Sequence, residues 1–323
     1  IEMFEPTIVE LKTKTKEIPF NIASRQQIAD RLMRRGWEPD VYTEKGNVVI
    51  NEAVLSKIKM PEAEMFSRYF LLQKRTGLLK SWIKECSNDL RVHGSVLTLK
   101  TITGRMAHHS PNMAQVPAVY SPYGKECRAL WGVSNSDTHK LVGTDASGLE
   151  LRCLAHYMND TNFTEEVLTG DVHTANQRAA GLKTRDQAKT FIYAFLYGAG
   201  AAKIGKVVGG SASTGQRLIS KFLSNMPALK VLRSNVSEAA KSGTIKGLDG
   251  RRLHIRSEHA ALNTLLQGAG AIVCKQWLVQ INEKVRRSGV DAKLVASVHD
   301  EYQFEVAKPD VQKFCKLTKE AMY

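Results

Sequence analysis

The spacing of apolar residues along the chain predicts a mixture of helices and strands. Apolar residues recur with the period of an amphipathic helix in the segments 24–35, 61 to about 85, 149–158, 183–197 and about 258–287. Short alternating or continuous apolar runs predict strands over 95–102, 139–144, 293–298 and 302–306. Because these elements follow one another without regular alternation, we expect an α+β fold rather than a doubly wound sheet.

Residues that start and stop regular structure support these boundaries. Ser24 is a good N-cap, Gly36 follows its helix, and Pro61 opens the next helix. Asp249, followed by glycine, predicts the turn of a hairpin over 245–255.

Composition narrows the class of protein. The chain has 323 residues, of which 43% are hydrophobic and 24% charged, which predicts packed domains and excludes wholesale disorder. No apolar run approaches the ~20 residues that span a membrane, so we expect no membrane protein. The five cysteines lie far apart in the sequence. This spacing argues against a disulfide framework or a cysteine zinc site and favours a reducing compartment.

Positive charge is concentrated in one part of the chain. Lys and Arg number 46 against 32 acidic residues, for a net charge of +14. The segment 183–256 alone carries 14 basic and three acidic residues. This density predicts a surface for a polyanion such as nucleic acid, with a solvated basic face as the alternative. No amphipathic helix pairs the charge with an exposed apolar stripe, so membrane-surface binding is not expected.

Two aspartates sit at the ends of short predicted strands. Asp145 follows the strand 139–144, and Asp300 lies in the tight turn between 293–298 and 302–306. If these strands are neighbours in one sheet, the two carboxylates converge. Two carboxylates together with substrate phosphates suit Mg²⁺, and a two-ion site can assist phosphoryl transfer. Turn-capping aspartates are the alternative.

One predicted helix carries a stripe suited to a nucleotide. Arg185, Lys189, Tyr193 and Tyr197 recur at every fourth position, so they form one slowly winding row. Two cations precede two aromatic residues, which matches the order of phosphates and base in a nucleoside triphosphate. The alternative is an ordinary amphipathic helix with both tyrosines in the core.

Other motif-like stretches are weaker. The segment 200–207 nearly spells a phosphate-binding loop, but Val207 stands where a Ser or Thr should be, and the stretch follows a helix. The pair His108 and His109 shows no metal-ligand spacing with a partner.

Several motifs together resemble family A DNA polymerases, in particular the T-odd phage-like branch of that family. The similar segments, in order, are Thr103-Gly-Arg105, Pro111-Asn-Met-Ala-Gln-Val-Pro117, Asp145-Ala-Ser-Gly-Leu-Glu-Leu-Arg152, Arg185 through Gly198, Asn263-Thr-Leu-Leu-Gln267 and Val298-His-Asp-Glu301. The resemblance covers most of the chain from about Ser24 onward.

The resemblance implies a right-hand fold with an antiparallel palm sheet, helical fingers and a partial helical thumb. It places a thumb remnant and the thumb-to-palm helices in 1–94, the first part of the palm in 95–155, the fingers in 156–257 and the second part of the palm in 258–323. The likeness starts inside the thumb and stops within the closing helix, so a processed or cropped product is expected. No Asp-x-Glu triplet that could start an exonuclease site occurs.

The resemblance also implies template-directed addition of deoxynucleotides to a primer 3′ end with two Mg²⁺ ions. By position, Asp145, Asp300 and the Ala146 carbonyl would hold the metal, with Glu301 as a nearby catalytic residue. Lys189 would also act as a general acid toward pyrophosphate.

For the incoming dNTP, the resemblance implies binding by Arg185, Lys189 and His173. It implies that Tyr193 packs on the sugar and that Glu150 blocks a ribose 2′-hydroxyl.

For primer–template DNA, the resemblance implies that Tyr197 gates the templating base. It implies that Arg105, Gln267 and His299 contact minor-groove edges, with Asn263 close by. The expected partners are primer–template DNA and dNTPs, together with a processivity factor or a helicase-primase. The expected setting is the cytoplasm of an infected host cell, in a phage-like replisome.

Two other functions stay open. A single-subunit RNA polymerase shares the palm and a similar helix, but Glu150 beneath the sugar argues against ribose. A non-catalytic nucleic-acid-binding remnant would not need both Asp145 and Asp300. Ala194 stands where the phage-like branch of the resembled family carries glycine.

Overall fold

The computed structural model describes residues 7–11 and 14–322. Residue contacts divide the chain into two compact units, Ile1–His93 and Gly94–Tyr323. Every strand pairing among the described residues is antiparallel. Helices and antiparallel strands are mixed along the chain, so the α+β prediction is confirmed. The assignment of segments to thumb, palm and fingers stays a prediction.

The first unit has a small core of its own. It contains the strands β1 (Thr7–Leu11) and β2 (Lys14–Ile18) and the helices α1 (Arg25–Arg34), α2 (Glu52–Leu55) and α3 (Pro61–Lys84). The Ser24 hydroxyl accepts a hydrogen bond from the Gln27 N–H, so the predicted N-cap is confirmed. Ile28, Leu32 and Phe66 are almost fully buried, and they tie α1 to α3 in one hydrophobic cluster.

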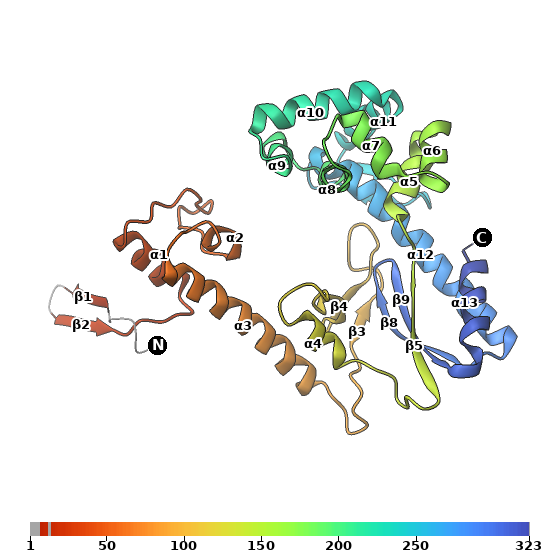
Figure 1. Ribbon diagram of the computed structural model, residues 1–323, viewed down its shortest axis with the longest axis horizontal. Helices are drawn as coiled ribbons and strands as arrows, with labels where there is room; N and C mark the ends of the chain where they lie inside the picture. Colours follow the sequence, from red (N-terminus) through yellow and green to blue (C-terminus); the bar gives the residue numbers. More distant parts are fainter. Residues whose placement is uncertain (1–6, 12–13, 323) are drawn as a thin grey trace. The chain divides into compact units, whose positions relative to one another are not determined.

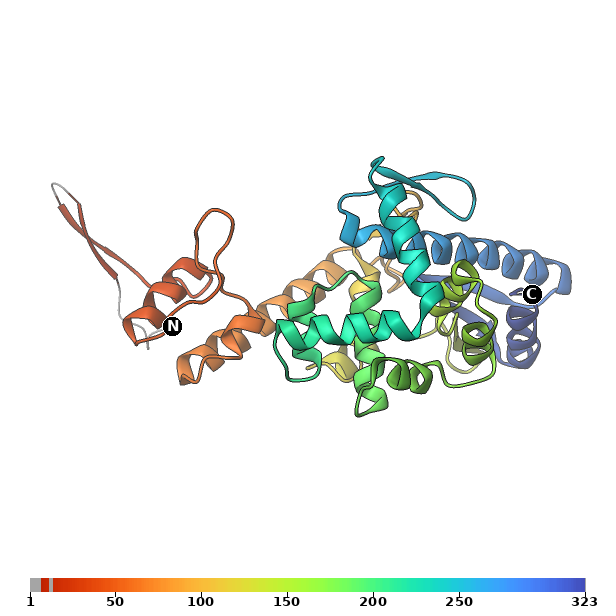
Figure 2. The same ribbon diagram turned by 90° about the horizontal axis from the view of Figure 1, so that it is seen from above.

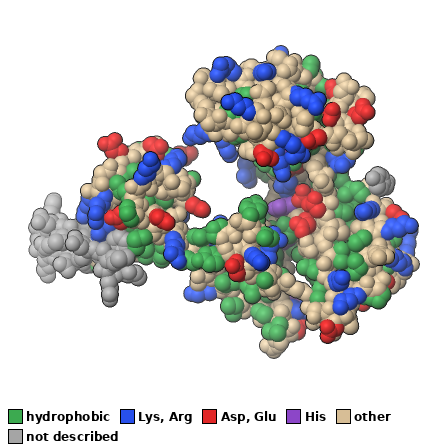
Figure 3. Space-filling view, in the orientation of Figure 1, with side chains coloured by type: hydrophobic (Ala, Val, Ile, Leu, Met, Phe, Trp, Pro, Cys, Tyr) green, Lys and Arg blue, Asp and Glu red, His purple; other side chains and the backbone are tan. Residues whose placement is uncertain are grey.

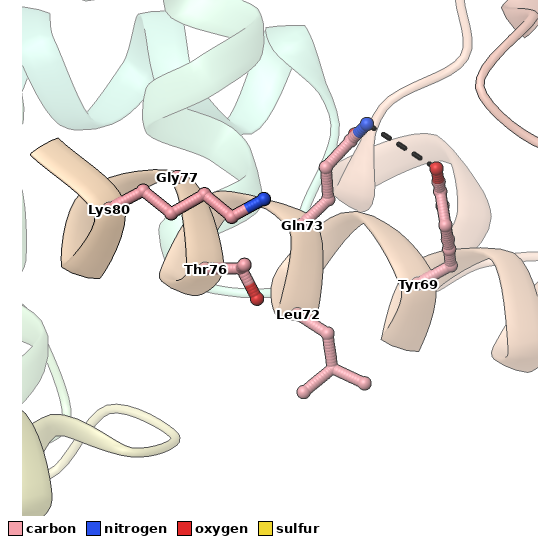
Figure 4. A pocket seen from close by; sticks show the side chains of 6 residues that line it. All are labelled: Tyr69, Leu72, Gln73, Thr76, Gly77 and Lys80. Atoms are coloured by element: carbon pink, nitrogen blue, oxygen red, sulfur yellow. Dashed lines mark hydrogen bonds between the residues drawn. The ribbon is translucent and has the colours of Figure 1, made fainter.

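A groove runs along α3. Figure 4 shows the six side chains that line it: Tyr69, Leu72, Gln73, Thr76, Gly77 and Lys80. Gln73 donates a hydrogen bond to the Tyr69 hydroxyl at 3.4 Å. The lining contains no carboxylate, histidine or cysteine, so the groove offers no catalytic set of its own.

A three-stranded sheet forms the centre of the second unit. Its strands are β5 (His139–Asp145), β8 (Ala292–Val298) and β9 (Glu301–Ala307), with β9 in the middle. One face of the sheet packs on α12 (Ala261–Ser288) and α13 (Val311–Glu320). On that face the Tyr302 ring lies 5.3 Å from the Trp277 ring, and Phe304 lies 4.8 Å from Phe314.

A group of helices lies beyond one end of this sheet. Its members are α5 (Leu149–Met158), α6 (Thr161–Leu168), α7 (Val172–Ala180), α8 (Arg185–Leu196), α9 (Ala201–Val207), α10 (Ala212–Asn225) and α11 (Pro227–Ala240). They group together at the top of Figure 1, and Figure 2 views them from above. Three phenylalanine rings pack together inside this helical group. Phe191 stacks on Phe195, and Phe222 meets both rings edge to face. Helix α12 runs from this group alongside the sheet (Figure 1).

Most predicted elements are confirmed, including the helices α5 and α8 and the strand β5. The predicted hairpin is confirmed as β6 (Thr244–Lys246) paired with β7 (Arg252–His254). The long helix begins later than predicted, because Glu258–Ala260 forms a 3₁₀ turn before α12.

The predicted strand over 95–102 is wrong for most of its length. Only β3 (Ser95–Leu97) is extended, and it pairs with β4 (Ala107–His109). The chain then turns, since the Gly104 N–H bonds to the Thr101 carbonyl and Gly104 has a φ of +78°. All three residues of β3 are exposed, so no core stabilises a longer strand.

Candidate functional site

The two aspartates predicted from the strand ends lie close together. Strand β5 pairs with β9 so that Asp145 stands opposite Glu301. The Ala146 N–H donates to the Asp300 carbonyl at 3.0 Å, which joins the end of β5 to the turn between β8 and β9. The strands that carry Asp145 and Asp300 are thus neighbours in one sheet, which is the condition under which the two carboxylates were expected to converge. Figure 3 shows acidic side chains and a histidine gathered in a hollow at the tips of β8 and β9, below the helical group.

Mutual repulsion marks this acidic cluster as a site for cations. Burial raises the pKa of the Asp145 carboxyl, and the negative charges of Asp300 and Glu301 raise it further. The Gln303 amide donates a hydrogen bond to Glu301. Gly143 makes room for that side chain, because a Cβ at Gly143 would lie 2.7 Å from the Gln303 amide nitrogen. Sequence reasoning missed Gln303, which alternation along β9 places on the same face as Glu301.

The donor atoms at this site fit magnesium. Asp145 and Asp300 offer carboxylate oxygens, and the Ala146 carbonyl, which accepts a hydrogen bond from the Leu149 N–H, offers a backbone oxygen. Hard oxygen ligands of this kind suit Mg²⁺, which commonly takes one or two carboxylates and fills its remaining positions with water and phosphate. No cage of three or more His, Cys, Asp or Glu side chains occurs in the described part of the chain.

Helix α8 presents the predicted stripe of cations and aromatic residues. Thr184 caps its first turn, and Phe191, Ile192, Phe195 and Leu196 bury its other side. The two tyrosines of the stripe are not core residues: Tyr197 is 49% exposed and Tyr193 is half-buried. Their ring centroids are 6.2 Å apart, so they form one aromatic surface.

The cationic end of the stripe meets the start of α7. Arg185 pairs with Asp171, which precedes α7, and the His173 ring lies 6.1 Å from the Tyr193 ring. Burial lowers the pKa of His173, and the positive charges of Arg185 and Lys189 lower it further, despite Asp171. The structure thus brings Arg185, Lys189, His173 and Tyr193 together. Sequence reasoning missed Asp171; its N-cap residue type before a helix was the only signal.

A carboxylate at the start of α5 links the stripe to the rest of the site. Glu150 accepts a hydrogen bond from Arg105 at 2.9 Å and another from the Tyr197 hydroxyl at 2.8 Å. Burial and Glu150 both raise the pKa of Tyr197, so its hydroxyl keeps its proton. The pKa of Tyr193 is raised by burial and by the charges of Glu150 and Asp300. Helix α8 and the acidic cluster therefore belong to one site.

The remaining predicted residues lie at the turn and on α12. His299 directly precedes Asp300 and has a φ of +58°. Its pKa is lowered by burial and by the charge of Arg105, so these two side chains lie near each other. Asn263 and Gln267 lie one turn apart on α12, and both are half-buried.

The rejected phosphate-loop motif has a packing role. The segment 200–207 forms helix α9, and a Cβ at Gly205 would lie 1.9 Å from the Ser211 carbonyl oxygen. Gly215 on α10 similarly allows close approach to the Ala201 carbonyl. These glycines therefore bring α9 and α10 together. A separate pocket between α5 and α6, lined partly by Arg152 and His156, contains none of the predicted site residues.

Comparisons with known proteins show the family of the chain. The model of the family "DNA polymerase family A" matches residues 2–323. The chain is 40% identical to the DNA-directed DNA polymerase of Enterobacteria phage T3 over 351 aligned positions, which cover 96% of this chain and 50% of the relative. It is 42% identical to that of Escherichia phage T7, covering 90% of this chain and 47% of the relative. The chain thus spans about half the length of these curated relatives.

A solved structure supports the fold. The polymerase domain of Pol1 from M. smegmatis, in complex with DNA primer-template and dNTP, superposes with a TM-score of 0.83. The match covers 94% of this chain and 58% of that chain, at 22% sequence identity. The predicted right-hand polymerase fold is thereby confirmed, and no described helix has the length and apolar character to cross a bilayer. On the strength of the family model and the phage relatives, this chain belongs to DNA polymerase family A.

Proposed function

We propose that the chain catalyses template-directed DNA synthesis, adding deoxynucleotides from dNTPs to a primer 3′ end by two-metal-ion phosphoryl transfer. The observation that carries this proposal is the meeting of two separate motifs. The acidic cluster of Asp145 and Asp300 and the row of Arg185, Lys189 and Tyr193 on α8 face one site. A phosphate-binding surface alone would not require the two carboxylates, whereas nucleotidyl transfer requires both parts.

The carboxylates supply the metal end of the proposed site. Asp145, Asp300 and the Ala146 carbonyl would hold two Mg²⁺ ions, with Glu301 beside them. When bound, such ions lower the pKa of an attacking hydroxyl and neutralise charge on the leaving phosphate. Burial raises the pKa of Asp145, and the negative charges of Asp300 and Glu301 raise it further, so a bound cation is favoured there.

Helix α8 supplies the nucleotide end. Arg185, Lys189 and the neutral His173 would bind the triphosphate, and Lys189 would donate a proton to the leaving pyrophosphate. Tyr193 would pack on the sugar. Glu150 would block a ribose 2′-hydroxyl, and its hydrogen bonds from Arg105 and Tyr197 fix the carboxylate in place.

Primer–template DNA would occupy the adjoining surface. Tyr197, 49% exposed at the end of α8, would gate the templating base. Arg105, Gln267 and His299 would contact minor-groove edges, with Asn263 nearby. The basic segment 183–256 supplies a field that attracts DNA.

The proposed assignment of segments follows the same reasoning. Residues 1–94 would form part of a thumb and its connection to the palm, 95–155 and 258–323 the palm, and 156–257 the fingers. The phage relatives suggest work in a phage-like replisome with a processivity factor or helicase-primase as partner.

Primer extension tests the proposed reaction. The chain is incubated with a primed template, Mg²⁺ and either four dNTPs or four rNTPs, beside Asp145→Ala and Asp300→Ala. We expect extension with dNTPs by the unaltered chain and a loss of about a thousandfold or more in both variants, because metal catalysis contributes several kcal/mol. Asp137→Ala, in the exposed turn before β5, is the matched control and should extend normally.

Each other outcome selects a different function. Equal extension by Asp145→Ala would remove the metal assignment. Efficient use of rNTPs would favour the RNA polymerase alternative. Tight binding of the primed template without any extension would favour a non-catalytic binding module.

A further inference from the structure

Asp171 holds Arg185 in a two-point ion pair. The Arg185 Nε donates to Asp171 Oδ2 at 2.7 Å, and Nη2 donates to Oδ1 at 3.1 Å. These hydrogen bonds from Arg185, followed by one from Thr174, hold the pKa of the Asp171 carboxyl far below its usual range. Asp171 is thus ionised at neutral pH, beside the cations of α8.

Asp171 is itself anchored to the backbone. Its Oδ1 accepts from the His173 N–H at 3.1 Å, and its Oδ2 accepts from the Thr174 hydroxyl at 2.7 Å. These bonds cap the first turn of α7 and fix the carboxylate. Arg185, in contrast, is a long side chain that is 51% exposed. The anchored carboxylate therefore restricts the rotamers of an otherwise mobile guanidinium.

The geometry of the pair leaves part of Arg185 free for another anion. A guanidinium carries five N–H donors, and this pair uses the Nε donor and one Nη2 donor. The Nη1 edge is not used by Asp171, and guanidinium edges bind phosphate oxygens well.

We propose that Asp171 is a positioning residue that holds Arg185 ready to receive the triphosphate of the incoming nucleotide. This inference rests on the proposed function, because it assigns the triphosphate to Arg185. Asp171 acts through Arg185 and does not contact the nucleotide. Pre-ordering one long side chain strengthens binding by about three- to tenfold.

The opposite role is a distinct alternative. A carboxylate next to a triphosphate site could repel the nucleotide or occupy Arg185 in its place. The two roles differ in sign, since removing a positioning residue weakens triphosphate binding whereas removing a competitor strengthens it.

The variant Asp171→Asn removes the ion pair with Arg185 but keeps the N-cap of α7, so it tests the two roles of Asp171 separately. Asparagine is as good an N-cap as aspartate, so α7 keeps its first turn. Its amide replaces one of the two acceptor oxygens with a donating NH2 group, so it cannot form the two-point pair with Arg185, and it carries no charge. Asp160→Asn is the matched control, because Asp160 caps α6 by accepting from the Phe163 N–H at 2.8 Å.

The test measures dATP binding in the presence of Mg²⁺ by calorimetry, on the full chain and without DNA. The proteins are the unaltered chain, Asp171→Asn, Arg185→Ala, the double variant and Asp160→Asn. Steady-state primer extension on the same proteins gives kcat and KM for dATP.

We expect Asp171→Asn to weaken dATP binding about three- to tenfold and to raise KM by a similar factor, with a smaller change in kcat. In the Arg185→Ala background the same substitution should have no further effect. Asp160→Asn should bind dATP like the unaltered chain. If binding follows this pattern but no protein extends a primer, the inference stands and the proposed function fails.

Three results would overturn the inference. Tighter dATP binding by Asp171→Asn would make Asp171 a competitor. An equal loss with and without Arg185 would mean that Asp171 acts through the helix alone. Absence of dATP binding by the unaltered chain would remove the triphosphate site itself.

Discussion

Single side chains in this site are held in place by hydrogen-bonded partners, some near in the sequence and some about 45 residues away. Glu150 is bound by Arg105 on one side and by Tyr197 on the other. Asp171 holds Arg185 by two hydrogen bonds, and Gln303 holds Glu301 by one. A site of this kind loses little side-chain freedom when it binds a nucleotide, which favours binding and orientation.

The Tyr193 hydroxyl can be tested alone. A dideoxynucleotide lacks the 3′-hydroxyl of the sugar. In the proposed site the Tyr193 hydroxyl would take the place of that group and make the hydrogen bond that is otherwise lost. We therefore expect Tyr193→Phe to increase discrimination against dideoxynucleotides by roughly two- to tenfold, the worth of one hydrogen bond. The measurement is the ratio of kcat/KM for dTTP and ddTTP. An unchanged ratio would remove the role given to this hydroxyl.

At the scale of elements, the end of α8 sets the position of Tyr197. Gly198 follows it with a φ of +75°, and a Cβ there would lie 2.3 Å from the His259 carbonyl oxygen. The helix therefore stops where its last turn meets the 3₁₀ turn Glu258–Ala260 that precedes α12. Only glycine satisfies both the left-handed conformation and the close approach.

Gly198→Ala should disturb this junction. The left-handed conformation costs about 1–2 kcal/mol for alanine, and the backbone clash adds to that cost. We expect the free energy of unfolding to fall by at least about 2 kcal/mol and nucleotide incorporation to decrease, because Tyr197 moves.

Gly209→Ala is the matched control for this variant. Gly209 has a φ of +71° but nothing within 4 Å of its Cβ position. Chemical denaturation should show only the cost of the left-handed conformation in the control, about 1–2 kcal/mol, and a larger loss in Gly198→Ala. Equal losses in both variants would mean that the contact with His259 contributes nothing.

At the scale of the whole molecule, the two compact units have separate cores. One hydrophobic cluster is built from residues between Phe20 and Phe66, and the other from residues between Ala146 and Ala321. Each cluster lies within one unit. We therefore expect two unfolding transitions in calorimetry.

Truncating one core side chain in each unit shows which unfolding transition belongs to which unit. Phe66 and Phe222 are fully buried, one in each cluster. Phe66→Ala should destabilise its unit by about 3–5 kcal/mol and lower one melting temperature. Phe222→Ala should lower the other by a comparable amount. A single transition that shifts in both variants would contradict independent cores.

Histidines with lowered pKa values predict acid sensitivity of the whole molecule. The pKa of His173 and that of His108 lie below the usual 6.5, mainly because both rings are partly buried. The unfolded chain then binds protons more readily, so stability is present above about pH 6.5 and falls as the pH drops below it. We expect a lower melting temperature at pH 5.5 than at pH 7.5.

The contribution of one ring can be isolated. His173→Gln should reduce the difference in melting temperature between pH 5.5 and pH 7.5. His93→Gln, at an exposed position, should leave it unchanged. A difference that is the same in all three proteins would show that His173 does not contribute.

The local elements could be predicted from the sequence. Helices α1, α3 and α5 follow from caps, prolines and the apolar period, because these signals act within a few residues. Asp145 and Asp300 could be found at strand ends, and the row on α8 follows from a spacing of four. The strand prediction for 95–102 was wrong because alternation of apolar and polar residues does not stabilise a strand that has no buried face.

Which of these elements meet could not be predicted locally and depends on the packing of the whole fold. The pairing of β5 with β9, which brings Asp145 opposite Glu301, joins strands more than 150 residues apart. The contacts of Glu150 with Arg105 and Tyr197, and of Asp171 with Arg185, likewise depend on packing across helices. A local pattern predicts that one face of a helix or strand will be buried, but it does not predict which other element covers that face. The covering element depends on how the whole hydrophobic core packs, and that packing brings the residues of the site together.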